Sequence, residues 1–229
     1  MDFYLKVNNM KVFNHCPPIN LGDLRDETFP SGRFYILEDG TKLPSITTVL
    51  NSLPKPGLHE WRQRVGEKEA NRITRVSASR GTSLHKICEN YIQNKENYFE
   101  KAMPDAKGMF QSIRPFLDRI DDVYYMEQAL WSKTIGIAGR TDLIAHFDKE
   151  LSVIDYKNSR RIKTKEHIRN YFIQATFYAL AHQELTGIPV RKIRIIMAVE
   201  DNDPILFSEN VRDYVEDLYN VRKYYRNLR

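Results

Sequence analysis

The chain has 229 residues, 41% of them hydrophobic, so it is long enough to bury one substantial core. No apolar run approaches the roughly twenty residues that a membrane-spanning helix needs, so we expect no membrane partner. The 35 Lys and Arg side chains outnumber the 30 Asp and Glu side chains, which gives a net charge of +5. This mild excess favours a polyanionic partner but does not identify one.

The cysteines and the first residues narrow the class further. Only Cys16 and Cys88 are present, which excludes a four-cysteine iron–sulfur cluster and gives no sign of a disulfide framework. The start of the chain has neither the charged and apolar segments of a signal peptide nor the arginine-rich character of a transit peptide. We therefore expect a cytoplasmic protein of a bacterium or of a phage-infected cell.

The first half of the chain is predicted to be mainly helical. Residues up to about Gly32 read as irregular, and residues 33–40 read as a small hairpin. Ser45 is a candidate N-cap for a helix that runs through Leu50. Apolar periodicity then predicts three more helices, which cover residues 59–79, 82–94 and 105–120, the last disturbed by Pro115.

The second half reads as strands with flanking helices. Strands are predicted at residues 123–131, 135–147, 151–157, 192–200 and 205–207, with a long helix at residues 166–186 closed by Gly187. Ser208 is expected to cap a terminal helix. These elements predict an α/β fold, with a central mixed β-sheet flanked by helices and a helical N-terminal cover.

Charged side chains interrupt two of the predicted strands. Asp142 lies in the strand over residues 135–147, a polar turn follows at residues 148–150, and Asp155 and Lys157 lie in the returning strand. Because side chains alternate along a strand, Asp155 and Lys157 share one face and Tyr156 points away. If Asp142 pairs near that face, two carboxylates and a lysine converge. These are the groups that metal-dependent phosphodiester cleavage requires.

Two further segments favour a catalytic site over charged residues that merely lie at the end of a strand. The sequence Arg80-Gly81-Thr82-Ser83-Leu84-His85 is expected to start a helix, and Gln174 and Tyr178 are four residues apart on one helix face. Taken singly, His85 reads as a hydrogen-bonded structural histidine and the Gln and Tyr as a polar stripe. The order of all four parts is what points to a catalytic site.

The order Gly-Thr-x-x-His, Gly-x-x-Asp, Asp-x-Lys and Gln-x-x-x-Tyr resembles the RecB-like exonuclease branch of the PD-(D/E)XK nuclease superfamily. In layout it is similar to bacteriophage exonucleases and the mitochondrial genome maintenance exonucleases. The segment from Ser45 to Leu50 also resembles an early helical motif of that branch, whereas Thr141 stands where the superfamily name has proline. The resemblance implies a restriction-endonuclease-like core at residues 122–229, under a hairpin and helical cover at residues 1–121, in one nuclease domain.

The resemblance also implies a role for each motif residue. His85, Asp142, Asp155 and the carbonyl of Tyr156 would bind Mg²⁺ or Mn²⁺, and Lys157 would act in catalysis with the two acids. The residues expected to support the site or contact nucleic acid are Gln174, Tyr178, Glu127 and the basic loop residues Arg160, Arg161 and Lys163. For Glu127 the expected role is a carboxylate just outside the metal ligands.

Three features outside the motifs have more than one interpretation. Glu89, one helical turn after His85, either orients the imidazole or a metal-bound water, or only solvates the helix. The basic residues between Arg62 and Arg80 suit a phosphate backbone or a solvated helix face. Aromatic side chains of the cover could stack on bases, although core packing is the commoner use of such rings; they are Trp61, Tyr91, Tyr98, Phe110 and Phe116.

The sequence thus predicts a metal-dependent DNA exonuclease that prefers single-stranded ends, in replication or repair and of bacteriophage type. One alternative is a structure-specific or nicking endonuclease in repair or packaging. Another is a non-catalytic DNA-binding protein, which the paired acids and Lys157 argue against, because binding phosphate needs basic residues only.

Overall fold

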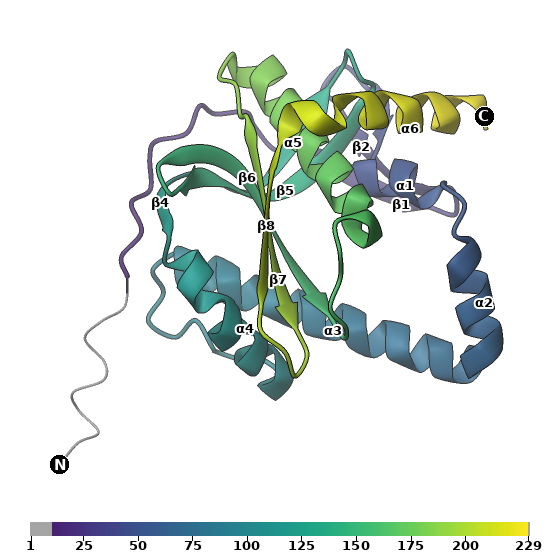
Figure 1. Ribbon diagram of the computed structural model, residues 1–229. Helices are drawn as coiled ribbons and strands as arrows, with labels where there is room; N and C mark the ends of the chain where they lie inside the picture. Colours follow the sequence, from purple (N-terminus) through teal and green to yellow (C-terminus); the bar gives the residue numbers. More distant parts are fainter. Residues whose placement is uncertain (1–10, 229) are drawn as a thin grey trace.

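The computed structural model describes residues 11–228 and contains two β-sheets with helices on both sides of the larger one (Figure 1). The larger sheet has the order β4-β5-β6-β7-β8, antiparallel except for the parallel pair β6 and β7. Its strands are β4 (Ile120–Ser132), β5 (Ile137–Phe147), β6 (Glu150–Ser159), β7 (Lys192–Val199) and β8 (Ile205–Asn210). The predicted mixed sheet flanked by helices is confirmed.

Each face of this sheet has its own hydrophobic core. On one face pack α1 (Ile46–Asn51), α5 (Arg169–Thr186) and α6 (Val215–Asn227), and on the other pack α3 (Glu67–Ile92) and α4 (Pro104–Leu117). Because β6 is buried on both faces, its side chains alternate between the two cores. Val153 faces α5, and Ile154 and Tyr156 face α3. The expected alternation along this strand is confirmed.

The N-terminal region forms a smaller sheet. β1 (Arg25–Phe29), β2 (Gly32–Ile36) and β3 (Lys42–Pro44) are antiparallel neighbours, so the segment before Gly32 is not irregular throughout, as the sequence suggested. Ser45 caps α1, accepting a hydrogen bond from the backbone N of Thr48 at 3.0 Å, as predicted.

Helix α2 (Pro56–Val65) and the first half of α3 stand away from the larger sheet (Figure 1). Ala70 is the one buried side chain among residues 57–79, so little apolar contact stabilises this part. We call residues 56–79 the arm. The break predicted near residue 80 is absent, because α3 continues through Gly81 to Ile92. The single helix predicted over residues 59–79 is instead divided at Gly66, between α2 and α3.

Two smaller expectations near the C-terminus have different outcomes. The long helix is present as α5 after a short 3-10 turn, η1 (Glu166–Ile168), and Gly187 closes it in the left-handed conformation with φ of 74°. Ser208 does not cap a helix, because it lies in β8. A second 3-10 turn, η2 (Val211–Tyr214), precedes α6 instead.

Within the described part of the chain, none of the helices combines the length and apolar character that crossing a membrane requires. Both cysteines are free thiols. Cys16 is half-buried, and Cys88 is a buried residue of α3 in the core between α3, α4 and the sheet.

Candidate active site

Three carboxylates lie at one level across the adjacent strands β4, β5 and β6. The β5–β6 register pairs Leu143 with Ile154, so the next position places Asp142 opposite Asp155. The β4–β5 register pairs residues 126 with 143 and 128 with 141, so Glu127 lies opposite Asp142. Like charges directly across a sheet destabilise it. This row therefore marks a place where the sheet is adapted to something other than its own stability.

Asp155 is the most deeply buried member of the row. Its side chain is 4% exposed, its Oδ2 lies 2.5 Å from Nζ of Lys157, and its Oδ1 has no hydrogen-bond partner. Burial raises the pKa of the Asp155 carboxyl to about 6, against the opposing charge of Lys157. Burial also lowers the pKa of Lys157, but Asp155 and Asp142 more than offset this, and the net shift is upward. Lys157 therefore stays charged beside a carboxylate that burial disfavours.

Asp142 and His85 meet beside the main chain of β6. Oδ2 of Asp142 accepts a hydrogen bond from the backbone N of Tyr156 at 3.1 Å, and it lies 3.3 Å from Nδ1 of His85. Nε2 of His85 is 2.7 Å from the carbonyl oxygen of Tyr156. The edge-to-face contact between the His85 and Tyr156 rings, with centroids 5.8 Å apart, holds the imidazole in this place.

Glu127 approaches the same two side chains. Ligand atoms of His85, Glu127 and Asp142 all lie within 4.8 Å of one another. Burial, and then the charge of Asp142, raise the pKa of the Glu127 carboxyl. Its backbone is left-handed with φ of 46°, and the guanidinium of Arg140 donates a hydrogen bond to its carbonyl oxygen. The carboxylate thus stands closer to the site than the sequence suggested.

Helix α5 packs over one face of the row of three carboxylates. Gln174 donates a hydrogen bond to the hydroxyl of Tyr178 at 3.1 Å, which agrees with their predicted common face. Tyr178 is 2% exposed, and burial raises the pKa of its hydroxyl well above its usual range. Nζ of Lys157 lies 5.0 Å from the ring centroid of Tyr171. No local pattern in the sequence distinguishes Tyr171, which precedes Gln174 by about one helical turn.

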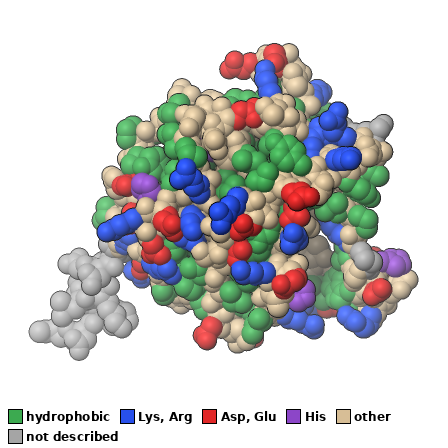
Figure 2. Space-filling model, turned by 45° about the horizontal axis from the view of Figure 1, so that its top comes forward, with side chains coloured by type: hydrophobic (Ala, Val, Ile, Leu, Met, Phe, Trp, Pro, Cys, Tyr) green, Lys and Arg blue, Asp and Glu red, His purple; other side chains and the backbone are tan. Residues whose placement is uncertain are grey.

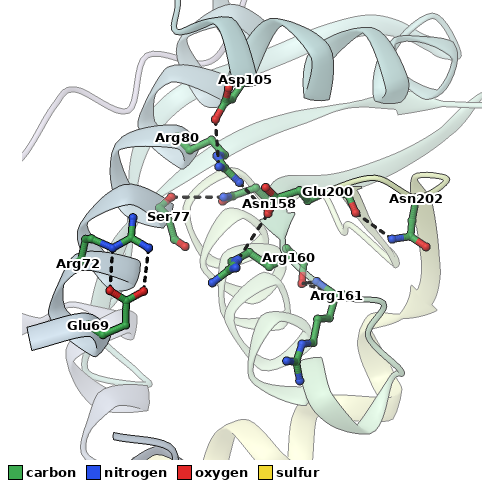
Figure 3. Close-up of polar contacts among 11 residues, drawn as sticks. Glu69, Arg72, Ser77, Arg80, Asp105, Asn158, Arg160, Arg161, Glu200 and Asn202 are labelled. Carbon is green, nitrogen blue, oxygen red and sulfur yellow. Dashed lines mark hydrogen bonds and ion pairs between the residues drawn. The ribbon is translucent and has the colours of Figure 1, made fainter. Parts of the chain in front are cut away.

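Helix α3 is fixed to the end of β6 by close polar contacts (Figure 3). Nδ2 of Asn158 donates a hydrogen bond to the carbonyl of Ser77 at 3.3 Å, and a Cβ on Gly81 would lie 2.9 Å from Oδ1 of Asn158. A larger residue at position 81 would therefore displace the Asn158 amide group. Asn158 directly follows Lys157, and Gly81 precedes His85 by four residues. This contact fixes the position of β6 relative to the part of α3 that carries His85.

Arg80 adds an ionic clamp to the same junction. Its side chain is 10% exposed and lies 3.0 Å from Asp105 on α4 and 3.0 Å from Glu200 after β7 (Figure 3). Glu200 also lies 3.6 Å from Nε of Arg160. Arg80 was noted in the sequence as part of the histidine motif. Its partners come from segments far along the chain, so no local pattern could reveal them.

The predicted nucleic-acid contacts lie on the surface next to this junction. Arg160, Arg161 and Lys163 are exposed in the loop after β6, and Arg160 faces the arm near Glu69 and Arg72 (Figure 3). Positive and negative side chains are intermixed on the face drawn in Figure 2.

Several expectations about the cover need correction. His85 lies in the middle of α3 and not at the start of a helix. Tyr91 and Phe110 are buried in the α3–α4 core and are not available to stack on bases, because core packing won over exposure. Glu89 forms an ion pair with Lys86 at 2.8 Å, which agrees with the helix-solvating interpretation.

The donors present suit a hard or borderline divalent cation. Carboxylate oxygens and a backbone carbonyl are ligands that Mg²⁺ accepts, and an imidazole widens the choice to Mn²⁺. The orphaned Oδ1 of Asp155 is a buried acceptor that a cation would satisfy. Thr141, at the proline position, is fully buried and presents no side chain that obstructs these groups.

The comparison with known families agrees with this geometry. The family model described as "PD-(D/E)XK nuclease superfamily" matches residues 56–228, about three quarters of the chain. The chain belongs to the PD-(D/E)XK nuclease superfamily. The match begins at the arm and includes every motif of the candidate site. The resemblance seen in the sequence is confirmed at the level of the superfamily.

Curated relatives are similar over a shorter span. Mitochondrial genome maintenance exonuclease 1 of Mus musculus is 27% identical over 175 residues, which cover 71% of this chain and 51% of that protein. The Homo sapiens protein of the same name is 27% identical over 176 residues, with the same coverage. The chain spans about half the length of the curated relatives it matches.

Among solved structures, the crystal structure of a candidate exonuclease from Eubacterium rectale aligns with 65% of this chain and 64% of that chain. The sequence identity is 12% and the TM-score is 0.46.

Proposed function

We propose that this chain is a metal-dependent deoxyribonuclease that hydrolyses phosphodiester bonds from DNA ends and prefers single-stranded DNA. The observation that carries the proposal is the convergence of Asp142, Asp155 and His85 beside Lys157, with Asp155 and Lys157 2.5 Å apart in a nearly buried site. A binding protein gains nothing from such buried acids. The exonuclease names of the curated relatives support the same reading.

In this proposal Asp142, Asp155, His85 and the Tyr156 carbonyl hold Mg²⁺ or Mn²⁺. The bound cation would polarise the scissile phosphate and lower the pKa of a bound water. Lys157, charged and nearly buried, would orient the attacking water or offset charge that develops on the phosphate. The residues Gln174 and Tyr178 would keep α5 against the row of acids, which maintains the position of Lys157 through Tyr171.

Single-strand preference and action from ends are supported by the surroundings of the site. The arm and the basic loop with Arg160, Arg161 and Lys163 lie on either side of the Asn158 junction, where a narrow polyanion could contact both (Figure 3). We further propose that residues 1–121 and 122–229 act as one nuclease domain, because α3 of the first part brings His85 to the sheet of the second. A cytoplasmic location and a role in replication or repair stay predictions from the sequence.

A gel time course tests the function. Linear single-stranded, linear double-stranded and circular single-stranded DNA are incubated with Mg²⁺, Mn²⁺ or EDTA, next to the Asp155→Ala variant. We expect metal-dependent shortening of the linear single strand, an intact circle and no turnover by the variant, with unchanged circular dichroism. Cutting of the circle would establish an endonuclease, and full activity of the variant would refute the site.

A further inference from the structure

We propose that the groove between the end of α6 and the β4–β5 turn docks an acidic segment of a partner protein. The groove is a cavity of about 640 Å³, lined by residues 134–135 of the turn and by α6 residues between Tyr219 and Asn227. It lies outside the row of acids, because β4 reaches the turn five residues after Glu127, roughly 17 Å at the rise of a strand. The proposal therefore goes beyond the nuclease function and does not depend on it.

The lining of the groove is positively charged. Arg222, Lys223 and Arg226 lie on its α6 side, and none of the described residues that line it is acidic. Lys223 and Arg226 are exposed, and neither forms an ion pair within the described part of the chain. Charges of one sign that line a concave surface focus the electric field and concentrate ligands of the opposite sign. Charge complementarity thus favours an acidic ligand.

The turn side of the groove is held in place before any ligand binds. Nε of Arg222 donates a hydrogen bond to the carbonyl oxygen of Ile135 at 2.9 Å. From α5, the carboxylate of Glu184 accepts hydrogen bonds from the hydroxyl of Ser132 at 2.5 Å and from the backbone N of Lys133 at 2.9 Å. A ligand therefore meets a surface that needs little further ordering, and this lowers the entropic cost of binding.

The end of α6 favours a peptide over a nucleic acid. The carbonyl groups of a last helical turn have no partner within the helix and carry partial negative charge, and the last turn of α6 includes the lining residues Arg226 and Asn227. Phosphate oxygens only accept hydrogen bonds, so a DNA backbone gains nothing from these carbonyls. A peptide offers N–H donors to them and carboxylates to the cations.

The groove is also separated from the proposed DNA contacts by the larger sheet. Helix α6 packs on the same face of the sheet as α5, whereas α3, which leads to the arm, packs on the opposite face (Figure 1). A partner bound at α6 would thus leave the arm and the basic loop open to DNA.

An apolar part of the lining adds a requirement on the sequence of the ligand. Ile135 and Tyr219 both line the groove, and Tyr219 is 48% exposed. An exposed tyrosine ring supplies a large contact area and loses little conformational entropy on binding. We therefore expect the acidic segment to carry one aromatic or aliphatic side chain among its carboxylates.

Fluorescence anisotropy on the full chain tests the docking site. The probe is a short fluorescein-labelled peptide of aspartate and glutamate with one central phenylalanine, and the control probe has asparagine and glutamine in place of the acids. The α6 variant carries Lys223→Gln and Arg226→Gln, and the matched arm variant carries Arg64→Gln and Arg75→Gln. We expect only the acidic probe to bind, with at least about tenfold lower affinity in the α6 variant, because two charge-assisted contacts are lost. The arm variant should bind the probe as the wild type does.

The remaining outcomes overturn the proposal. One is equal affinity of the acidic probe for the α6 variant and the wild type, and another is no binding to the wild type at about 1 mM probe. An α6 variant that keeps the probe but loses affinity for single-stranded DNA would assign the groove to nucleic acid. The nuclease function is judged separately by DNA cleavage, which the α6 variant should retain at the wild-type rate. Both substitutions are at exposed positions, so its circular dichroism spectrum should be unchanged.

Discussion

The two halves of helix α3 differ in almost everything except their continuity. The second half lies on the sheet, buries Leu84, Ile87 and Cys88, and carries His85 into the row of acids. The first half, with α2, forms the arm, where the side chains are exposed or half-exposed apart from Ala70. One half owes its helix to tertiary packing, whereas the other depends on local propensity and ion pairs such as Arg72 with Glu69 at 2.7 Å. One continuous helix thus joins a packed end that carries His85 to an outer end with little buried surface.

The largest effect is expected from truncating a buried side chain of the packed half. Leu84→Ala removes a fully buried side chain from the α3–α4 core and should lower the free energy of unfolding by about 2–5 kcal/mol. Val76→Ala, in the arm and 36% exposed, is the matched control and should change it by less than about 0.5 kcal/mol. Urea denaturation measures both. Equal losses would show that the arm packs as tightly as the rest of α3.

Lys157→Met should separate chemistry from binding. The variant keeps most of the side-chain volume but removes the charge beside Asp155, so kcat should fall by about a hundred- to a thousandfold. Because the basic arm is untouched, the Kd for single-stranded DNA should stay within about threefold. Single-turnover kinetics and fluorescence anisotropy measure the two quantities. A large loss of affinity with kcat unchanged would move Lys157 from chemistry to binding.

The raised pKa of Asp155 gives the metal-free protein a pH-dependent stability. The folded-state pKa of about 6 exceeds the ordinary value of 3.8, so the folded protein binds more protons than the unfolded one between these values. This contribution is fully present below about pH 4 and is lost as the pH rises through about 6. It amounts to roughly 2–3 kcal/mol.

The measurement compares thermal unfolding of the wild type and Asp155→Asn in EDTA between pH 4 and 7. The wild type should lose stability relative to Asp155→Asn as the pH rises. Parallel curves would mean that Lys157 compensates the buried carboxylate in full. Adding Mn²⁺ should reverse the trend in the wild type, because a bound cation favours the ionised carboxylate.

The smallest effect is expected at the outer end of α3 and its neighbour α2. Arg64 and Arg75 are exposed, and neither makes an ion pair within the described residues. Replacing both by Gln should weaken single-stranded DNA binding by about tenfold and reduce the slope of log K against log salt by about one. The matched control, Lys223→Gln with Arg226→Gln on α6, removes the same charge elsewhere. Equal effects of both pairs would mean that net charge and not the arm attracts DNA.

Local signals predicted the elements whose ends are set by neighbours in the sequence. Ser45 with Thr48, the alternation around Tyr156 and the Gly187 stop each depend on residues a few positions apart. The prediction from apolar periodicity divided α3 between residues 79 and 82. In the structure α3 continues through Gly81, which lies against the side chain of Asn158, 77 positions later. Ser208 failed for a similar reason, because pairing with β7 held it in a strand.

The candidate site could be predicted in part because its register follows from one turn. Asp148 and Lys149 both have positive φ, which makes a two-residue hairpin turn and sets Asp142 opposite Asp155. A three-residue turn, as expected from the sequence, would have displaced that pairing by one residue. The sequence could not predict how close Glu127 lies to His85 and Asp142, because the backbone conformation of Glu127 depends on a hydrogen bond from Arg140.

The buried thiol of Cys88 makes the closure of α3 on the sheet measurable. Cys88 lies three residues after His85, beneath the helix, and burial raises its pKa well above the usual range. A thiol reagent can modify it only when that turn of α3 lifts away, whereas the half-buried Cys16 lies outside this helix. The rate at which Cys88 is modified therefore reports how often this turn of α3 opens. Any ligand that bridges His85 to the sheet should lower that rate.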